Sequence, residues 1–193
     1  MGIRYNDESY LAAWRDEGKF PRIHDNIFTL FMQTFEADSV IDMCCATGLL
    51  GTRISEKTGI DVVGVELLEK NIVRAKKFGV EMEFFQMFIE RRTLPAFVNL
   101  IKERKATGIV ARRCISELFG NTPDQTVDWE WSRIWSAAVA EAGIKEIWIE
   151  GRADQGRSVH PVPDTATEIR CLESRYYVDE TLKGCAYLRV KDV

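Results

Sequence analysis

Two short apolar runs that each carry an acidic residue near their end limit the folds open to this chain more than any other feature. The first, Val40–Met43, contains Asp42 and is followed by a turn of small residues, Cys44–Gly48, and then by an amphipathic stretch. The second, Val62–Glu66, ends in a carboxylate. This order predicts a strand, a loop and a helix whose free N–H groups face a ligand, beside a second strand whose Glu66 can accept both hydroxyls of a ribose.

The residues of the turn argue against a phosphate-bearing ligand. A loop that holds pyrophosphate needs bare glycine where the backbone approaches the ligand, but Cys44 and Ala46 carry side chains there. No lysine directly follows Gly48, as a P-loop would require. We therefore expect the turn to bind an adenosine ligand without phosphates.

Strand-like and helix-like segments alternate along most of the chain. Strands separated by helices imply right-handed crossovers and a parallel sheet. Two further strands, joined by a turn that contains Gly184, predict a hairpin at the end of the chain. The expected fold is an α/β, three-layer Rossmann-like sheet, mostly parallel, with an antiparallel C-terminal hairpin strand. We expect a single domain over residues 1–193, with a helical lead-in at 1–36 and the core at 37–193.

The expected elements can be given by residue number. The strands are expected at 39–44, 61–66, 81–87, 108–111, 146–150, 175–178 and 185–190. The helices are expected at 6–35 in two pieces, and at 49–57, 68–78, 94–103, 128–142 and 165–172.

The segment from Asp42 to Gly48, together with Glu66, resembles the class I S-adenosylmethionine-dependent methyltransferases. The first motif of that superfamily usually contains an acid followed by alternating glycines, of which this chain keeps Gly48. The form Asp-x-Cys-Cys-x-Thr-Gly is similar to variants found among some RNA-directed members. The resemblance implies S-adenosylmethionine as the cofactor, with Asp42 near its methionine end. It places Cys44, Ala46 and Gly48 in the turn beneath the cofactor and Glu66 on the 2′- and 3′-hydroxyls.

Residues directly after the later strands are the next candidates, because ligands of open α/β sheets lie beyond the carboxyl ends of the strands. Gln86 is the polar residue best placed to meet the adenine edge, and a simple exposed strand end is the alternative. Arg112 and Arg113 stand where amino-directed methyltransferases carry an Asp/Asn-Pro-Pro-aromatic tetrad, which is absent. The two arginines could instead orient a carboxylate or phosphate of the acceptor. The competing interpretation is that they pair with a nearby acid such as Glu117.

The segment Val110–Leu118 also has a faint local similarity to bacterial ribosomal-RNA guanine-N7 methyltransferases, and Ile147–Arg152 is similar to a strand end of that family. The resemblance implies an acceptor that is either a small molecule or an RNA or nucleotide. It also leaves room for a partner subunit or a homo-oligomer that supplies recognition. The alternative is a non-catalytic S-adenosylmethionine-binding, scaffold or inhibitor protein on the same fold.

Several aromatic and basic residues have both a functional and a structural interpretation. One of Trp129, Trp131 and Trp135 could stack on a planar ligand, although core packing is expected for a pair one helical turn apart. The lead-in carries Lys19, Arg22 and His24, and in this superfamily such a segment often folds over the cofactor. His160 could act as a base or be a solvated loop residue, beside Arg152 and Arg157. Cys114 lacks the sequence context of a nucleophile.

Composition excludes some classes of protein. No apolar run approaches the roughly 18 residues needed to cross a bilayer, and acidic residues appear too early for a signal peptide, so a cytoplasmic location is expected. The five cysteines have no zinc-like spacing, which favours reduced thiols and no metal site. A net charge of −4 argues against a partner bound through a broad positive surface.

Overall fold

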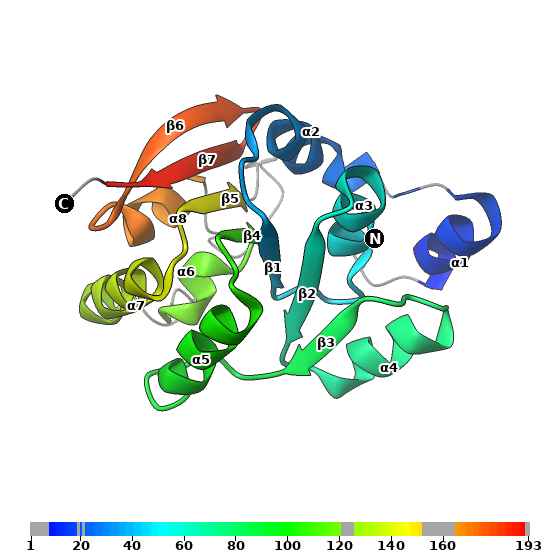
Figure 1. Ribbon diagram of the computed structural model, residues 1–193, viewed down its shortest axis with the longest axis horizontal. Coiled ribbons are helices and arrows are strands. Elements are labelled where there is room, and N and C mark those ends of the chain that lie inside the picture. Colours follow the sequence, from blue (N-terminus) through cyan, green and yellow to red (C-terminus); the bar gives the residue numbers. More distant parts are fainter. Residues whose placement is uncertain (1–7, 19, 21, 121–125, 152–164, 192–193) are drawn as a thin grey trace.

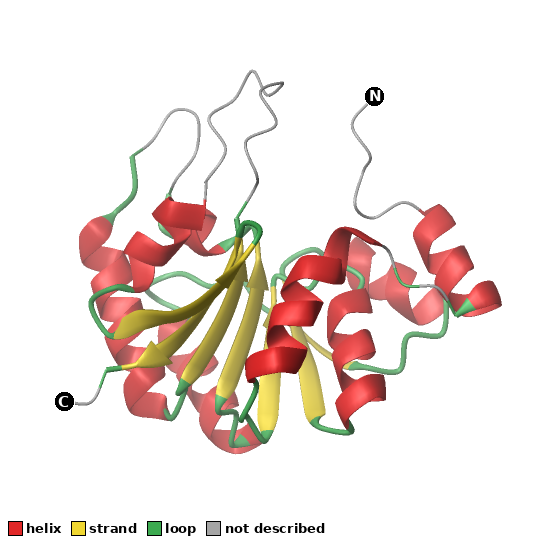
Figure 2. Ribbon diagram, turned by 90° about the horizontal axis from the view of Figure 1, so that it is seen from above, coloured by secondary structure: helices red, strands yellow, loops and turns green. Residues whose placement is uncertain are grey.

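In the computed structural model, which describes residues 8–18, 20, 22–120, 126–151 and 165–191, seven strands form one sheet with helices on both faces (Figures 1 and 2). The strands are β1 (Ser39–Met43), β2 (Asp61–Glu66), β3 (Glu83–Gln86), β4 (Gly108–Arg112), β5 (Glu146–Glu150), β6 (Tyr176–Leu182) and β7 (Cys185–Val190). The helices are α1 (Glu8–Glu17), α2 (Asp25–Thr34), α3 (Leu49–Thr58), α4 (Glu69–Lys77), α5 (Leu94–Arg104), α6 (Ile115–Leu118), α7 (Trp129–Ala142) and α8 (Thr165–Leu172), with a 3₁₀ turn η1 at Arg22–His24.

The order of the strands across the sheet is β3-β2-β1-β4-β5-β7-β6. The first five strands in this order pair in parallel, and β7 runs antiparallel to both β5 and β6. The order of the strands reverses between β1 and β4, because β2 and β3 follow on one side of this point and β4 and β5 on the other; this is the switch point where ligands bind in open α/β sheets. The predicted fold class, a mostly parallel sheet with an antiparallel hairpin strand, is confirmed.

Two apolar layers hold the helices against the sheet. On one face the buried side chains of α5, α7 and α8 pack on β1, β4 and β5, with Phe97, Trp135 and Leu172 among them. On the other face α2 and α3 pack on the same strands, and the indole of Trp148 lies 4.6 Å from the ring of Phe31. Since β1, β4 and β5 are covered on both sides, their continuous apolar runs are those of a buried parallel sheet.

The lead-in forms two helices, as expected, and they pack against different parts of the protein. Helix α2 lies against the sheet, where Ile27, Leu30 and Phe31 are buried. Helix α1 packs beyond it through Leu11, in a small cluster that includes Phe78 after α4. Figure 1 shows α1 at the edge of the molecule, beside α3 and α4. Helix α2 therefore covers β5, β6 and β7, on the face that α3 also covers, whereas α1 lies beside α3 and α4.

Helix α6 and strands β3 and β6 differ from the expected elements, and β3 is the shorter Glu83–Gln86 where 81–87 was expected. Helix α6 was not expected, because four residues are too few for a helical period to show in the sequence. Strand β6 continues to Leu182, beyond the expected end at 178, with an irregular register between Val178 and Glu180. The alternation of apolar and polar residues is weak there because most of this edge strand is exposed.

Candidate functional site

The carboxyl ends of β1 and β2 lie next to each other and bring the first two acidic residues to the same edge of the sheet. Asp42 pairs with Gly64 and Met43 with Val65 in the parallel register. The turn after β1 is fastened to β2, because the N–H of Cys45 donates to the carbonyl of Val65 at 3.1 Å. The two segments singled out from the sequence are therefore neighbours, as predicted.

The turn itself is tightly coiled and uses left-handed backbone at three positions. Cys44 has φ 56°, Ala46 has φ 53° and Gly48 has φ 74°. The N–H of Gly48 donates to the carbonyl of Cys45 at 2.8 Å, which closes the turn before α3 begins. Left-handed backbone costs a residue with a Cβ atom about 1–2 kcal/mol, so the surrounding structure must hold Cys44 and Ala46 in place.

Glu66 stabilises this turn through hydrogen bonds. Its carboxylate is buried, and Oε2 accepts from the N–H of Ala46 at 2.7 Å while Oε1 accepts from the N–H of Leu68 at 2.8 Å. Each carboxylate oxygen has a second lone-pair direction, so both can still accept a hydroxyl. Glu66 thus joins the end of β2 to the turn after β1 and keeps the capacity to bind a diol.

Asp42 lies beneath the turn, where its carboxyl group is buried. Its Oδ2 accepts from the N–H of Gly51 in the first turn of α3 at 2.9 Å. Burial, against the opposing hydrogen bond from Gly51 and with a further contribution from the charge of Glu66, raises the pKa of Asp42 to about 7, although Arg112 also opposes the rise. Asp42 therefore holds a proton to higher pH than an ordinary aspartate does.

Glycines beside the turn are required by contact as well as by backbone angle. A Cβ atom on Gly48 would lie 2.5 Å from Cε of Met82 and 2.9 Å from Cζ of Phe84. A Cβ atom on Gly51 would lie 2.6 Å from Sδ of Met82, and one on Gly64 would lie 2.5 Å from Cε of Met82. The side chain of Met82 thus fills the space that three glycines leave, which the sequence did not indicate.

Arg112 and Arg113, at the end of β4, share one carboxylate. Nε of Arg112 lies 2.8 Å from Oε2 of Glu150, and Nη2 of Arg113 lies 3.3 Å from Oε1 of the same residue. The pairing with an acid that the sequence allowed is present, but its partner is Glu150 across the β4–β5 pair. The side chain of Glu117, the acid suggested from the sequence, lies outside the described part of the chain. The parallel register sets Arg112 opposite Glu150 and so brings the two side chains together.

His24 enters the site from the lead-in. Its Nδ1 is buried and has no hydrogen-bond partner among the described residues. Burial, together with the charges of Arg112, Arg53 and Arg113, lowers the pKa of His24 to about 3. The imidazole is therefore neutral near pH 7. Arg22 is exposed and Lys19 lies outside the described residues.

A cavity of about 160 Å³ lies between these groups. Its lining includes His24, Asp42, Cys44, Cys45, Ala46, Arg112 and Arg113, together with the first residues of α3. The structure thus brings together five of the predicted site residues and adds His24. Gly48 caps α3 next to the cavity, and Glu66 reaches it through Ala46. Gln86 stands apart, exposed at the end of β3, where its Nε2 donates to the carbonyl of Leu67 at 3.3 Å.

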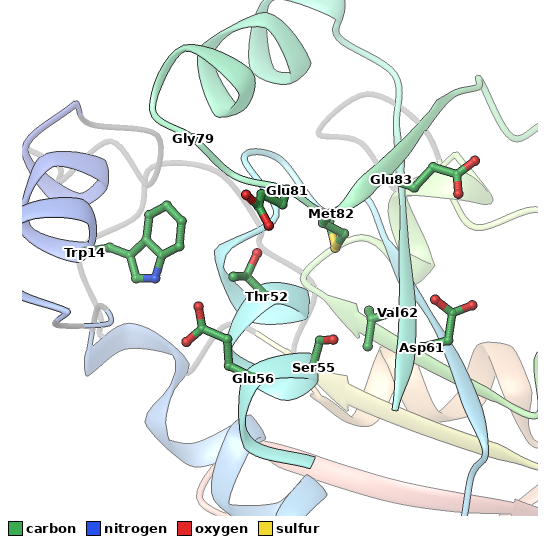
Figure 3. A pocket seen from close by; sticks show the side chains of 10 residues that line it. All are labelled: Trp14, Thr52, Ser55, Glu56, Asp61, Val62, Gly79, Glu81, Met82 and Glu83. Atoms are coloured by element: carbon green, nitrogen blue, oxygen red, sulfur yellow. The ribbon is translucent and has the colours of Figure 1, made fainter. Parts of the chain in front are cut away.

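A larger cavity of about 480 Å³ lies at the opposite ends of β2 and β3 (Figure 3). Trp14 of α1 faces Thr52 and Glu56 of α3, and the carboxylates of Asp61, Glu81 and Glu83 complete the lining. Asp61 and Glu83 begin their strands, so this cavity is at the amino ends of the strands, away from the edge where ligands of α/β sheets bind.

The remaining candidates from the sequence have mainly structural roles. Trp131 and Trp135 are buried in the core, whereas Trp129 is 36% exposed, with the guanidinium of Arg170 4.5 Å above its ring. Cys114 is buried, and its thiol donates to the carbonyl of Met43. The residues Arg152, Arg157 and His160 lie outside the described residues. Within the described chain there is no group of three or more residues arranged to hold a metal, and no helix is long and apolar enough to span a membrane.

Solved structures resemble this fold, whereas no protein-family model and no curated protein matches the chain. A TehB-like S-adenosylmethionine-dependent methyltransferase from Corynebacterium glutamicum aligns with a TM-score of 0.57 and 16% identity, over 95% of this chain and 97% of that one. A structure described by the conversion of a disulfide bond into a thioacetal group during echinomycin biosynthesis aligns with a TM-score of 0.58 and 14% identity, over 95% and 92% of the two chains.

A third similar structure belongs to a longer protein. Monomeric WbdD aligns with a TM-score of 0.55 and 11% identity, over 98% of this chain but 42% of that one. WbdD is described as a bifunctional kinase-methyltransferase, and this chain spans less than half of its length. At these identities the likeness establishes the fold, a Rossmann-like sheet of the kind that methyltransferases use.

Proposed function

We propose that this chain is an S-adenosylmethionine-dependent methyltransferase that binds its cofactor at the carboxyl ends of β1 and β2. The observation that carries the proposal is the place of Glu66, a buried carboxylate that ends the second strand and is bonded to the turn after the first. An acid at this position meets a ribose in Rossmann-like sheets. The cofactor, when bound, supplies an electrophilic methyl group, so the chain's own residues need mainly to bind it, align the acceptor and exclude water.

The groups around the cavity fit the amino-acid end of that cofactor. A volume of about 160 Å³ is small beside the roughly 300–1,000 Å³ of complete small-molecule sites, so the cavity suits one end of the ligand only. The partnerless Nδ1 of His24 offers a hydrogen bond there, and Asp42 offers a carboxyl group. The nucleoside would then lie along the open edge between Glu66 and Gln86, where the side chain of Leu67 is exposed.

The acceptor is proposed to carry an anionic group. Arg112 and Arg113 line the cavity and present guanidinium groups that suit a carboxylate or phosphate. Such an acceptor would share or replace the ion pairs with Glu150, which would couple acceptor binding to the position of both arginines. A small molecule and an RNA or nucleotide both meet this requirement.

Titration calorimetry with S-adenosylmethionine and S-adenosylhomocysteine tests the cofactor. We expect both to bind, and we expect Glu66→Gln to weaken binding by roughly 2–4 kcal/mol because it removes charge-assisted hydrogen bonds to the ribose. Glu56→Gln is the matched control, since Glu56 lines the cavity at the opposite ends of the strands. Absence of binding by the unaltered protein, or equal affinities for the two variants, would refute the proposed site.

A second candidate function is supported by one specific observation. The arginines that would orient an acceptor already form ion pairs with Glu150, and the Asp/Asn-Pro-Pro-aromatic tetrad of amino-directed methyltransferases does not follow β4. These features would also suit a sensor or inhibitor that binds the cofactor without turnover. Transfer of a labelled methyl group into fractionated RNA, protein and metabolites distinguishes the two functions, because tight cofactor binding with no labelled fraction would favour the sensor.

A further inference from the structure

We propose that a groove formed by the start of α7, the end of α8 and the residue after β7 binds a nucleotide unit of single-stranded nucleic acid. The groove has a volume of about 520 Å³ and is lined by Trp129, Arg133, Arg170, Glu173 and Lys191, with two serines. Figure 1 shows α7, α8 and the end of β7 on the same side of the molecule. None of these residues lines the cavity beside the turn, so the proposal does not depend on methyl transfer.

The groove presents an exposed aromatic surface at Trp129. Trp131 and Trp135 of the same helix are buried, but Trp129 is 36% exposed, and the guanidinium of Arg170 lies 4.5 Å from its ring. Unpaired bases stack on aromatic rings and on guanidinium planes. Because Arg170 already lies over the indole, the pair offers a base both an apolar and a cationic surface.

The lining of the groove carries a net positive charge. Arg133, Arg170 and Lys191 contribute three positive charges to the lining and Glu173 one negative charge, in a protein whose formal net charge is −4. Within the described residues, neither Arg133 nor Arg170 forms an ion pair with a carboxylate, and both are exposed. Lys191 is directed across the groove, where its ammonium donates to the carbonyl of Glu173. Two guanidinium groups are thus available to phosphate, which they bind through paired N–H donors.

The size of the groove suits a single nucleotide unit. A volume of about 520 Å³ falls within the range of sites for one small organic ligand, not within that of a double helix. A base can enter such a site only when it is unstacked and unpaired. The same chemistry is present in a free nucleotide and in a single strand, so the experiment has to separate these two sources.

Fluorescence anisotropy with a labelled ten-residue oligouridylate tests the proposal, with competition by uridine monophosphate and by heparin, a polyanion without bases. We expect the oligonucleotide to bind, Trp129→Leu to weaken it about fivefold or more, and Trp129→Phe to weaken it less. Arg170→Gln should also reduce the salt dependence of binding by about 0.7 in the slope of log K against log salt. Competition by the monophosphate at comparable concentration would identify a free nucleotide as the ligand.

Lys102→Gln is the matched control, because Lys102 is an exposed cation of α5 that is not part of the groove. Trp129, Arg133 and Arg170 are surface residues, so their variants should keep the far-ultraviolet circular dichroism of the parent. No binding of the oligonucleotide, an unchanged affinity in both Trp129→Leu and Arg170→Gln, or displacement by heparin with no effect of Trp129→Leu would overturn the proposal.

Discussion

The carboxylate of Glu66 accepts a 2.7 Å hydrogen bond from the backbone N–H of Ala46, twenty residues earlier in the chain. Ala46 has left-handed backbone, which an alanine seldom adopts without support. The same carboxylate also accepts from the N–H of Leu68. One acidic side chain therefore fixes the turn after β1 relative to the loop after β2, and the ribose-binding residue of the proposed site is also a structural residue of that site.

Glu66→Ala should destabilise the protein in the absence of any ligand. It leaves two partly buried backbone N–H groups without their charged acceptor, which we expect to cost roughly 2–4 kcal/mol in the free energy of unfolding. Urea denaturation measures this loss. Glu83→Ala is the control, because Glu83 is exposed and pairs only with Arg104 among the described residues, and surface pairs contribute about 0–1 kcal/mol. Equal losses in the two variants would contradict the structural role.

Two glycines with nearly the same φ angle allow the free-energy cost of left-handed backbone to be separated from the cost of steric crowding by an added Cβ atom. Gly48 has φ 74° and Gly59 has φ 75°, but an added Cβ atom meets Met82 and Phe84 at Gly48 and nothing within 4 Å at Gly59. Gly59→Ala should cost about 1–2 kcal/mol from the left-handed angle alone. Gly48→Ala should cost about 1–3 kcal/mol more, because the well-packed Met82 must shift.

Shortening the crowding side chain gives the internal check. In the background Met82→Ala, the difference between Gly48→Ala and Gly59→Ala should shrink, since the nearest atom has been removed. Thermal or urea denaturation of the four combinations provides a double-mutant cycle. A difference that persists in full in the Met82→Ala background would show that crowding by Met82 is not the cause.

The fold could be predicted from the sequence because its elements are long enough to show their periods. Strands such as Val62–Glu66 and helices such as 128–142 carry clear apolar patterns, and their alternation predicts a parallel sheet. The four-residue helix α6 carries no such pattern and was missed. The edge strand β6 was placed too short, because exposure on both sides removes the alternation on which the prediction depends.

The site was predicted in part, and the missing part depends on contacts that spacing does not reveal. Asp42, Cys44, Ala46 and the two arginines were named from the sequence and line one cavity. Glu150 and Met82 were missed because their roles come from pairing across β4 and β5 and from packing against glycines in three different elements. A carboxylate at the end of a buried strand beside two arginines is the signal that could have identified Glu150.

Glu150→Gln tests the shared ion pair. The side chains of Arg112 and Arg113 are 12% and 19% exposed, so the substitution removes a charged acceptor from two largely buried guanidinium groups and should cost about 1.5–3 kcal/mol of stability. Glu130→Gln is the control, because Glu130 is exposed and shares Arg91 with Asp128. Added sulfate should recover part of the loss in Glu150→Gln only, since an anion can take the place of the carboxylate. No recovery would mean that the arginines do not accept an external anion.

Asp42 and His24 give the stability of the folded protein opposite dependences on pH. The pKa of Asp42 is raised to about 7 by burial and by Glu66, so its contribution to stability is full below about pH 4 and is lost as the pH rises through 7. The pKa of His24 is lowered to about 3 by burial and by Arg112, Arg53 and Arg113, so its contribution is full above about pH 6.5 and is lost as the pH falls. Each group changes stability by about 1.4 kcal/mol per pH unit in its window, and the two slopes offset each other between about pH 4 and 6.5.

Single variants should reveal the two slopes. Asp42→Asn keeps an oxygen for the N–H of Gly51 and removes the buried charge, so it should gain about 4 kcal/mol relative to the parent at pH 8 but only about 1.5 kcal/mol at pH 5. The free energy of unfolding of His24→Gln, measured relative to the parent, should be roughly 2 kcal/mol higher at pH 5 than at pH 8. At pH 5 the unfolded parent binds a proton at His24 that the folded parent does not bind. Urea denaturation at the two pH values measures both. An Asp42→Asn gain that is equal at pH 5 and pH 8 would show that Asp42 is ionised throughout, and an unchanged pH dependence in His24→Gln would show that the imidazole is not held neutral.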